Sequence, residues 1–391
     1  MTATAFVNVA RLATCDPLQG RGVAGVLHDA ALVVDDGRVA WVGASADLPQ
    51  AAGDDVVDAA GRCVIPGFVD SHAHLVFAGD RSEEFAARAA GGAYAPGGIL
   101  TTVRATRAAS TPELSALASA RRHAALRQGT TTMESKSGYG LSVADEARSC
   151  TVAASTADAA TFLGAHAVPP EFEGAADDYV ALVCSTMLDA CAPSVGFIDV
   201  FCERGAFDAD QAAAVLAAGA RHGLRAKVHA NQLGVGDGVR VAVAANAVSA
   251  DHCTYLSAAD IDALAASATV AVLLPITEFS TRTAYADGRR LLDAGATVAL
   301  ASNCNPGSGY SSSMHLAIAL AVREQGLTPL EALAAATAGG AAALARDDVG
   351  AIRVGAKADL VLLDAPDPVH LAYRPGMDLV AGVWREGLRV R

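Results

Sequence analysis

Short apolar runs alternate with Ala-rich stretches of helical character from Cys63 onward. Eight such runs occur, at residues 63–74, 130–134, 160–166, 196–203, 225–231, 247–253, 269–275 and 297–303. Nearly continuous apolar strands that alternate with helices are typical of a parallel sheet covered on both faces. The pattern therefore predicts an α/β fold, a (β/α)8 TIM barrel formed by residues 63–345.

The stretches between these runs carry signals of helix boundaries. In the stretch after Ser110, Thr111 is expected to cap a helix, Pro112 suits its first turn, and Gly129 ends it. Residues 208–223 and 327–344 have the same helical character.

The two ends of the chain predict a second, smaller unit. Residues 30–45 contain two apolar runs around Asp35, Asp36 and Gly37, and residues 349–366 and 380–391 again form short runs around Gly-containing turns. Neither end is long enough to bury a core alone. We therefore expect residues 1–62 and 346–391 to pair into one composite, β-sandwich-like domain beside the barrel.

Composition narrows the class of protein. Of the 391 residues, 52% are hydrophobic and 18% are charged, which indicates a large buried core. The net charge of −13 argues against binding to nucleic acid, and no apolar run reaches the roughly 18 residues of a membrane span. The first residues do not resemble a signal peptide, and the eight scattered cysteines are expected to be reduced. We expect a cytoplasmic protein.

Polar residues gather where the predicted strands end. These residues are His72, His74, Glu134, His166, Glu203, His229, His252 and Asn303. A lone histidine after a strand is more often a loop or core residue. Five of the ten histidines at one face of a barrel instead indicate a metal or acid–base site, because active sites of such barrels lie at the C-terminal ends of the strands.

The His72-x-His74 pair is the sharpest local signal. Alternate residues of a strand point the same way, so both imidazoles can reach one ion. With His229 and His252 they supply enough neutral nitrogens for a catalytic Zn²⁺ or Fe²⁺ site that keeps an open position. A structural site would use cysteines, and the chain has no Cys-x-x-Cys motif.

Longer motifs carry a resemblance to a known family. The first of these motifs covers residues 66–100. Shorter motifs follow it along nearly the whole chain, in the order in which the family has them: "ESKSGYGL", "FLGAHAVP", "DVFCERGAFD", "KVHANQLG", "SADHCTYLS" and "NPGS". In these motifs the chain resembles the amidohydrolase superfamily and, within it, the imidazolonepropionase family. The resemblance implies hydrolysis of 4-imidazolone-5-propanoate to N-formimidoyl-L-glutamate, the third step of histidine degradation, at one Zn²⁺ or Fe³⁺ ion.

The resemblance also implies roles for individual residues. It assigns metal ligation to His72, His74, His229 and position 303, and it assigns to His252 the steadying of the attacking water or the polarisation of the ring carbonyl. Gln232 is counted with the catalytic residues as well as with the substrate contacts. The implied substrate contacts are Arg81, Tyr94, Tyr139, His166, Gln232, Asn305, Gly307 and Ser308.

The chemistry of several side chains agrees with these roles. Arg81 suits bidentate recognition of the propanoate carboxylate, although outside this motif a surface pair with Glu83 or Glu84 would be the simpler interpretation. Tyr139 lies in a glycine-containing loop, where the alternative is a packed loop tyrosine. Glu134 and Glu203 are expected to orient a histidine or an arginine.

Position 303 departs from the family pattern, which has Asp where this chain has Asn303. An amide oxygen can still bind an ion, but an amide cannot accept a proton at neutral pH. Three interpretations are open. Asn303 is an introduced substitution that slows turnover, a natural variant whose base is another residue such as His252, or the mark of a paralogue that binds without catalysis.

Competing functions follow from the same motifs. The first alternative is a hydrolase with the same metal-dependent chemistry but a different substrate, such as a deaminase or another cyclic amidase. The second is a catalytically silent protein that binds a small acidic ligand. Metal analysis combined with a turnover assay separates these alternatives. A homodimer is expected by analogy alone.

Overall fold

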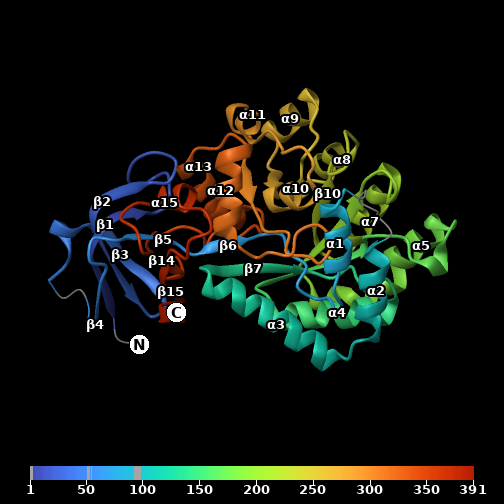
Figure 1. Cartoon of the computed structure of the whole chain (residues 1–391), viewed down its shortest axis with the longest axis horizontal. Helices are drawn as coiled ribbons and strands as arrows, with labels where there is room; N and C mark the ends of the chain where they lie inside the picture. Colours follow the sequence, from blue (N-terminus) through green and yellow to red (C-terminus); the bar gives the residue numbers. More distant parts are fainter. Residues whose placement is uncertain (1–2, 51–52, 54, 92–97) are drawn as a thin grey trace.

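The computed structural model describes residues 3–50, 53, 55–91 and 98–391. In these residues, eight parallel strands follow one another around a barrel in chain order (Figure 1). They are β6 (Phe68–Asp70), β7 (Thr130–Lys136), β8 (Ala159–Ala165), β9 (Phe197–Cys202), β10 (Arg225–Ala230), β11 (Ser249–His252), β12 (Val270–Leu273) and β13 (Val298–Leu300). Each lies within or overlaps one of the eight predicted runs, so the predicted TIM barrel is confirmed.

Helices lie between and around these strands. They are α1 (Ser82–Ala89), α2 (Ile99–Ala108), α3 (Thr111–Arg127), α4 (Val143–Thr156), α5 (Ala176–Leu182), α6 (Leu188–Cys191), α7 (Ala209–Arg221), α8 (Gly238–Ala244), α9 (Ala258–Ala265), α10 (Pro275–Thr281), α11 (Gly288–Asp293), α12 (Met314–Glu324), α13 (Pro329–Ala334), α14 (Gly340–Ala342) and α15 (His370–Tyr373). Short helical turns are η1 (Ser45–Asp47), η3 (Pro170–Phe172), η4 (Val183–Met187), η5 (Ala192–Ser194) and η6 (Ala335–Gly339). Among the described residues, none of these helices is long and apolar enough to cross a membrane.

The start of α3 differs from the prediction by one residue. Ser110, and not Thr111, is the N-cap, because the Ser110 side chain accepts a hydrogen bond of 3.3 Å from the Glu113 N–H. Its backbone is extended, which is the conformation an N-cap requires. Pro112 lies in the first turn, as predicted.

The two ends of the chain form one second sheet beside the barrel. Its order is β16–β15–β14–β5–β1–β2–β3, with β4 paired to β1. N-terminal strands are β1 (Thr4–Ala13), β2 (Val26–Asp35), β3 (Arg38–Ala44), β4 (Asp55–Asp58) and β5 (Cys63–Pro66), and C-terminal strands are β14 (Leu360–Leu363), β15 (Val380–Arg385) and β16 (Leu388–Arg389). In Figure 1 the blue and red ends of the chain lie together in this sheet. The predicted composite β unit is therefore confirmed.

The first predicted run, residues 63–74, is divided between the two sheets. Its beginning, β5, pairs with β1 and β14 of the small sheet, and β6 begins the barrel only at Phe68. Only Gly67 lies between the two strands. One chain segment thus links the two units directly.

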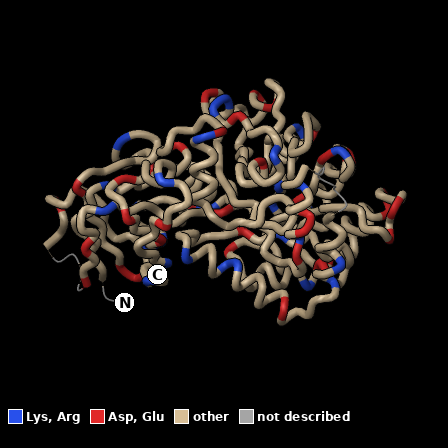
Figure 2. Tube along the Cα trace, in the orientation of Figure 1, with Lys and Arg blue, Asp and Glu red and all other residues tan. Residues whose placement is uncertain are grey.

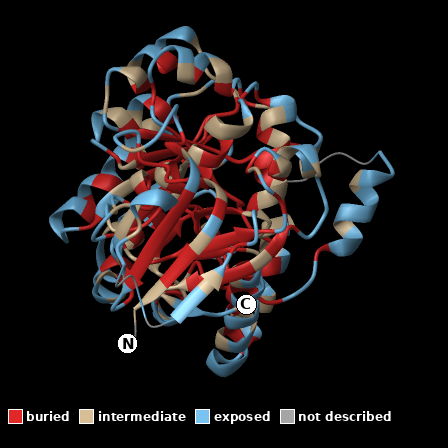
Figure 3. Ribbon diagram, turned by 90° about the vertical axis from the view of Figure 1, so that its left-hand side faces the viewer, coloured by how far each residue is buried: buried red, intermediate tan, exposed pale blue. Residues whose placement is uncertain are grey.

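Both units bury apolar side chains, and Figure 3 shows the strands mostly buried and the outer helices largely exposed. The core of the small sheet joins residues from both ends of the chain. The rings of Phe6 and Trp384 meet edge to face at a centroid distance of 5.0 Å. Charges of both signs are interspersed along the chain (Figure 2).

The barrel has a seam between its first and last strands. The segments that follow β6 and β13 are joined there by backbone hydrogen bonds: the Asn303 N–H donates to the His72 carbonyl oxygen over 2.9 Å, and the His74 N–H donates to the Cys304 carbonyl oxygen over 3.0 Å. The Ser302 N–H also donates to Asp70 Oδ1 over 3.0 Å. Residues of the first and last strand ends are therefore held side by side.

Two glycines let a helical segment lie directly on this seam. A Cβ at Gly340 would lie 2.1 Å from the carbonyl oxygen of Val69, and a Cβ at Gly339 would lie 2.3 Å from that of Val298. Real Cβ atoms do not approach backbone this closely. Only glycine therefore allows η6 and α14 to cover β6 and β13.

We predict that Gly340→Ala destabilises the protein by roughly 1–3 kcal/mol, because the added methyl group overpacks the seam. The control is Gly196→Ala, since a Cβ at that exposed glycine would meet no atom within 4 Å. Thermal denaturation should give a lower midpoint for the first variant alone. Equal midpoints for the two variants would contradict the packing argument.

Candidate active site

A cavity opens at the C-terminal ends of the barrel strands. It contains about 760 Å³ of space, part of it open to solvent, which suits a small ligand. The predicted site residues that line it are His74, Arg81, Tyr139, His166, His229, Gln232, His252, Asn303, Asn305, Gly307 and Ser308. Tyr94 lies outside the described residues.

Four histidines meet at the floor of this cavity. His72 and His74 follow β6, His229 lies in β10 and His252 ends β11. Ligand atoms of His72, His229 and His252 all lie within 4.8 Å of one another, and His74 Nε2 lies 3.3 Å from His72 Nε2. All four side chains belong to buried residues. The structure thus brings the predicted histidines together, and the group within 4.8 Å contains His252 and not His74.

Burial keeps three of these imidazoles neutral. It lowers the pKa of His72, His74 and His252 well below the usual range of histidine, and neighbouring positive charges act in the same direction. The Nδ1–H of His72 donates to Asp251 Oδ2 over 2.6 Å, which leaves the Nε2 lone pair for another partner. His229 Nδ1 lies 3.0 Å from Asp199 Oδ2.

The donor set fits a transition-metal ion of the kind that imidazoles bind. The two Nε2 atoms of His72 and His74 face each other at 3.3 Å. Within the described part of the chain, the buried Nδ1 atoms of His74 and His252 have no hydrogen-bond partner. Facing imidazole nitrogens are what a metal site requires, and for His74 the unpartnered Nδ1 is the ring nitrogen other than the facing Nε2.

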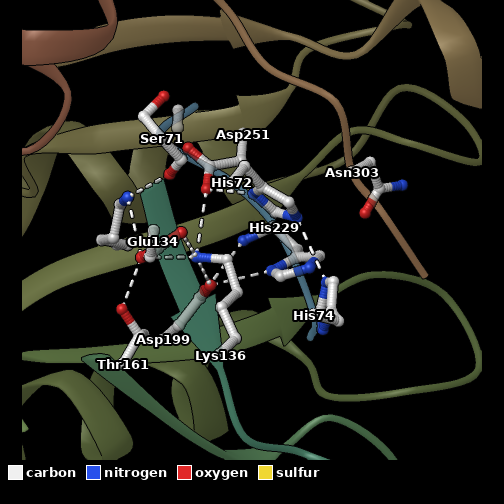
Figure 4. A network of polar contacts seen from close by, with 12 residues as sticks. Ser71, His72, His74, Glu134, Lys136, Thr161, Asp199, His229, Asp251 and Asn303 are labelled. Carbon is white, nitrogen blue, oxygen red and sulfur yellow. Dashed lines mark hydrogen bonds and ion pairs between the residues drawn. The ribbon is translucent and has the colours of Figure 1, made fainter. Parts of the chain in front are cut away.

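Asn303 completes the floor of the cavity. Its backbone has φ of 53°, a left-handed conformation that asparagine tolerates better than most residues. The amide nitrogen donates to Thr277 Oγ1 over 2.6 Å and to Ser308 Oγ over 3.3 Å. These bonds leave the amide oxygen on the side of the histidines, as Figure 4 shows. Asn303 can therefore offer a neutral oxygen to an ion.

Arg81 forms part of the cavity wall and is held by a neighbour. Its Nε and Nη2 atoms donate to the two carboxylate oxygens of Glu84 over 2.8 and 2.7 Å. The pair with Glu84 exists, but the Arg81 side chain is only 5% exposed, so it is not a surface pair. A Cβ at Gly307 would lie 2.3 Å from Arg81 Nη1, so glycine at this position leaves room for the guanidinium.

Aromatic rings form another part of the cavity wall. His166 stacks on His74 with a centroid distance of 5.4 Å and an interplanar angle of 19°, and Tyr139 lies 5.3 Å from His166. The Nδ1–H of His166 donates to the Gly138 carbonyl oxygen over 2.9 Å. Burial lowers the pKa of His166 to about 3, so its Nε2 is a hydrogen-bond acceptor. This wall can stack against a flat polar ring.

The loop after β13 is held by Asn305. Its side-chain oxygen accepts hydrogen bonds of 2.8 Å from the N–H groups of Gly307 and Ser308, and its side-chain nitrogen donates to the Asn303 carbonyl oxygen over 2.8 Å. Asn305 therefore shapes the loop that carries two other predicted contacts.

The expected partners of the two glutamates were wrong. Glu134 contacts Lys136 and Lys227, whereas Glu203 accepts hydrogen bonds from the backbone N–H groups of Arg204 and Leu233. Neither contact is to a histidine or to an arginine side chain.

Sequence reasoning also missed four charged residues beneath the histidines. They are Lys136, Asp199, Lys227 and Asp251, and their side chains are 0% exposed. The available signal was a charged residue inside an otherwise apolar strand, as in "DVFCE", "KVHAN" and "SADHC". Charges almost never lie fully buried unless they are paired, so such positions point to buried ion pairs.

Comparison with known sequences places the chain among the amidohydrolases. Two models described as "Amidohydrolase family" match residues 204–388 and 55–133. Imidazolonepropionase of Mycolicibacterium smegmatis is 62% identical over 387 residues, with 99% of this chain and 97% of the relative covered. Imidazolonepropionase of Streptomyces griseus is 59% identical, with both chains covered completely.

Solved structures share the fold at much lower sequence identity. A triazine hydrolase variant superposes with a TM-score of 0.74 at 18% identity, covering 100% of this chain and 95% of the other. Atrazine chlorohydrolase of Arthrobacter aurescens, crystallised with zinc, gives a TM-score of 0.72 at 18% identity, covering 99% and 95%. The full-length similarity to the bacterial enzymes shows that this chain belongs to the imidazolonepropionase family of amidohydrolases.

Proposed function

We propose that this protein hydrolyses 4-imidazolone-5-propanoate to N-formimidoyl-L-glutamate. The observation that most strongly supports this proposal is the convergence of His72, His229 and His252. Their ligand atoms lie within 4.8 Å of one another at the floor of a cavity whose wall includes Arg81. Relatives at 62% and 59% identity are named imidazolonepropionase, which supports this substrate. In the reaction, the ring carbonyl carbon gains the oxygen of water, its bond to nitrogen breaks, and that nitrogen takes a proton.

His72, His74, His229 and Asn303 would hold the metal ion. When bound, such an ion lowers the pKa of water and polarises a carbonyl group. His252 reaches the same point from β11, and its neutral imidazole can accept a proton that Asn303 cannot.

Substrate recognition would divide between the two walls of the cavity. The Arg81 guanidinium binds the propanoate carboxylate, because a planar cation matches a carboxylate. Tyr139, His166 and Gln232 face the imidazolone ring, where stacking and hydrogen bonds fix its plane. Asn305, Gly307 and Ser308 border the carboxylate end, and Tyr94 is counted with the same group from the sequence alone.

For the metal we propose Zn²⁺, with Fe³⁺ as the other ion considered. Three imidazoles and one amide carry no negative charge, so they compensate a trivalent ion less well than a divalent one. The related fold of atrazine chlorohydrolase was crystallised with zinc.

We place the protein in the cytoplasm and expect a homodimer. The eight cysteines are free, and seven of them are buried, which agrees with a reducing compartment. Light scattering of the purified protein measures the oligomeric state.

The first test combines elemental analysis with an assay that follows loss of the ultraviolet absorbance of the imidazolone. We expect about one metal ion per chain, turnover of the substrate, and loss of activity on chelation that returns with Zn²⁺. Bound metal without turnover would instead support the silent binding protein. Turnover of another cyclic amide or of an aminated ring alone would support the alternative hydrolases.

Asn303→Asp should raise the rate of hydrolysis at least tenfold. A carboxylate at this position can accept a proton from water and pass it to the leaving nitrogen, and a positioned general base contributes roughly 10²–10⁴ in rate. Thr277 and Ser308 already lie within hydrogen-bond distance of side chain 303. The measurement is the steady-state rate of hydrolysis by the parent and the variant at equal metal content. Equal rates would show that the side chain at position 303 does not act as the base.

Arg81→Gln should lower kcat/KM for 4-imidazolone-5-propanoate by roughly 10- to 100-fold, since a hydrogen bond to a charged group contributes about 1.5–3 kcal/mol. The matched control is the uncharged propanamide analogue of the substrate. Parent and variant should hydrolyse this analogue at similar rates. An equal loss for acid and amide would mean that Arg81 only supports the cavity wall.

A further inference from the structure

Five charged side chains form a buried network beneath the histidine cluster. They come from β7, β9, β10 and β11 and are Glu134, Lys136, Asp199, Lys227 and Asp251, each 0% exposed at its side chain (Figure 4). The network holds three carboxylates and two ammonium groups. Burying so many charges is costly unless each has a specific partner.

Lys136 lies between the two aspartates that contact the histidines. Its Nζ is 2.8 Å from Asp199 Oδ2 and 3.5 Å from Asp251 Oδ2. The same Asp199 oxygen lies 3.0 Å from His229 Nδ1, and the same Asp251 oxygen lies 2.6 Å from His72 Nδ1. One ammonium group therefore fixes both oxygens to which the two imidazoles are tied.

Lys227 has a different set of partners. Its Nζ donates to the Ser71 carbonyl oxygen over 2.8 Å and to Glu134 Oε1 over 3.0 Å. Glu134 Oε2 is also 3.1 Å from Lys136 Nζ. The two lysines are thus equally buried, and both contact Glu134. Among the described residues, Lys136 is the lysine that lies within 4 Å of both Asp199 and Asp251.

The position of Lys136 favours a role in fixing the two aspartates over a role in only balancing the negative charge of the network. Burial alone would lower the pKa of Lys136, but the carboxylates of Asp199, Glu134 and Asp251 raise it above its usual value, so the ammonium is retained. A group that only balanced charge could lie anywhere in the network. Lys136 instead lies where it contacts both histidine-bound oxygens.

We infer that Lys136 is a positioning residue, which acts through Asp199 and Asp251 to aim His229 and His72 at one metal ion. The inference rests on the proposed metal site. Carboxylates such as Asp199 and Asp251 set the orientation of a ligating imidazole and increase its basicity, and loss of such partners typically weakens metal binding 10- to 100-fold. Lys136 acts one contact further away, by holding both carboxylates.

The test compares two charge-balanced double variants as metal-free, full-length proteins. Lys136→Met with Glu134→Gln, and Lys227→Met with Glu134→Gln, each remove one cation and one anion from the network. Only the first removes the ammonium group that lies within 4 Å of both aspartates, although the charge of Lys227 also acts on Asp251. Zn²⁺ affinity is measured by competition with a chromophoric chelator, Co²⁺ coordination by visible absorption, and stability of the metal-free proteins by thermal denaturation.

We call the double variant with Lys136→Met the Lys136 pair and the double variant with Lys227→Met the Lys227 pair. We expect the Lys136 pair to bind Zn²⁺ 10- to 100-fold more weakly than the parent protein and to change the Co²⁺ spectrum. The Zn²⁺ affinity of the Lys227 pair should stay within about threefold of that of the parent, with an unchanged Co²⁺ spectrum. Equal losses in the two pairs, or an unchanged affinity in the Lys136 pair, would overturn the inference. Failure of the Lys136 pair alone to fold would also overturn it, because the lysine would then serve the fold.

The parent protein separates this inference from the proposed function. If the parent binds no Zn²⁺ or Co²⁺, the metal site and the proposed hydrolysis fail together. If the parent binds both ions and the two double variants behave alike, only the role of Lys136 fails.

Discussion

The hydrogen bond from the Asn303 N–H to the His72 carbonyl oxygen joins the first and last parts of the barrel. Together with the hydrogen bonds from the His74 N–H to Cys304 and from the Ser302 N–H to Asp70, it joins the two edges of the sheet. With it, position 303 lies beside the first two histidines, although 231 positions of sequence separate Asn303 from His72. Gly339 and Gly340 allow the covering helical segment to approach the same seam. The candidate active site therefore depends on how the barrel closes.

Burial at this site has two opposite effects that the fold must balance. It keeps the imidazoles of His72, His74 and His252 neutral, which suits them to bind an ion, and it makes the charges beneath them costly. The cost is met by placing cations and anions on adjacent strands. Asp199 lies in β9 and Asp251 in β11, on either side of the strand that carries His229, while Lys136 reaches them from β7. Side chains from three strands, β7, β9 and β11, thus form the contacts that connect Lys136 to His72 and His229.

Much of the architecture follows from local patterns in the sequence. Apolar runs separated by helical stretches predict the eight barrel strands, and the histidines at their ends predict the cavity. The division of residues 63–74 was not predicted, because an apolar run does not reveal which of two sheets it joins. The cap of α3 was misplaced by one residue, since Ser110 and Thr111 are both good capping residues.

The buried network was beyond the reach of sequence patterns for a different reason. Asp199, Lys227 and Asp251 interrupt apolar strands, whereas Lys136 ends the polar strand β7. The contacts from Lys136 to Asp199 and Asp251 join different strands, so no spacing rule relates these residues. The histidine site itself is tested most directly by X-ray absorption at the zinc edge of the metal-loaded protein. The account predicts at least three imidazole ligands at about 2.0–2.1 Å and no sulfur. Burial raises the pKa of Cys304 to about 12, which keeps this neighbouring thiol protonated. A sulfur ligand near 2.3 Å, or fewer than three imidazoles, would contradict the account.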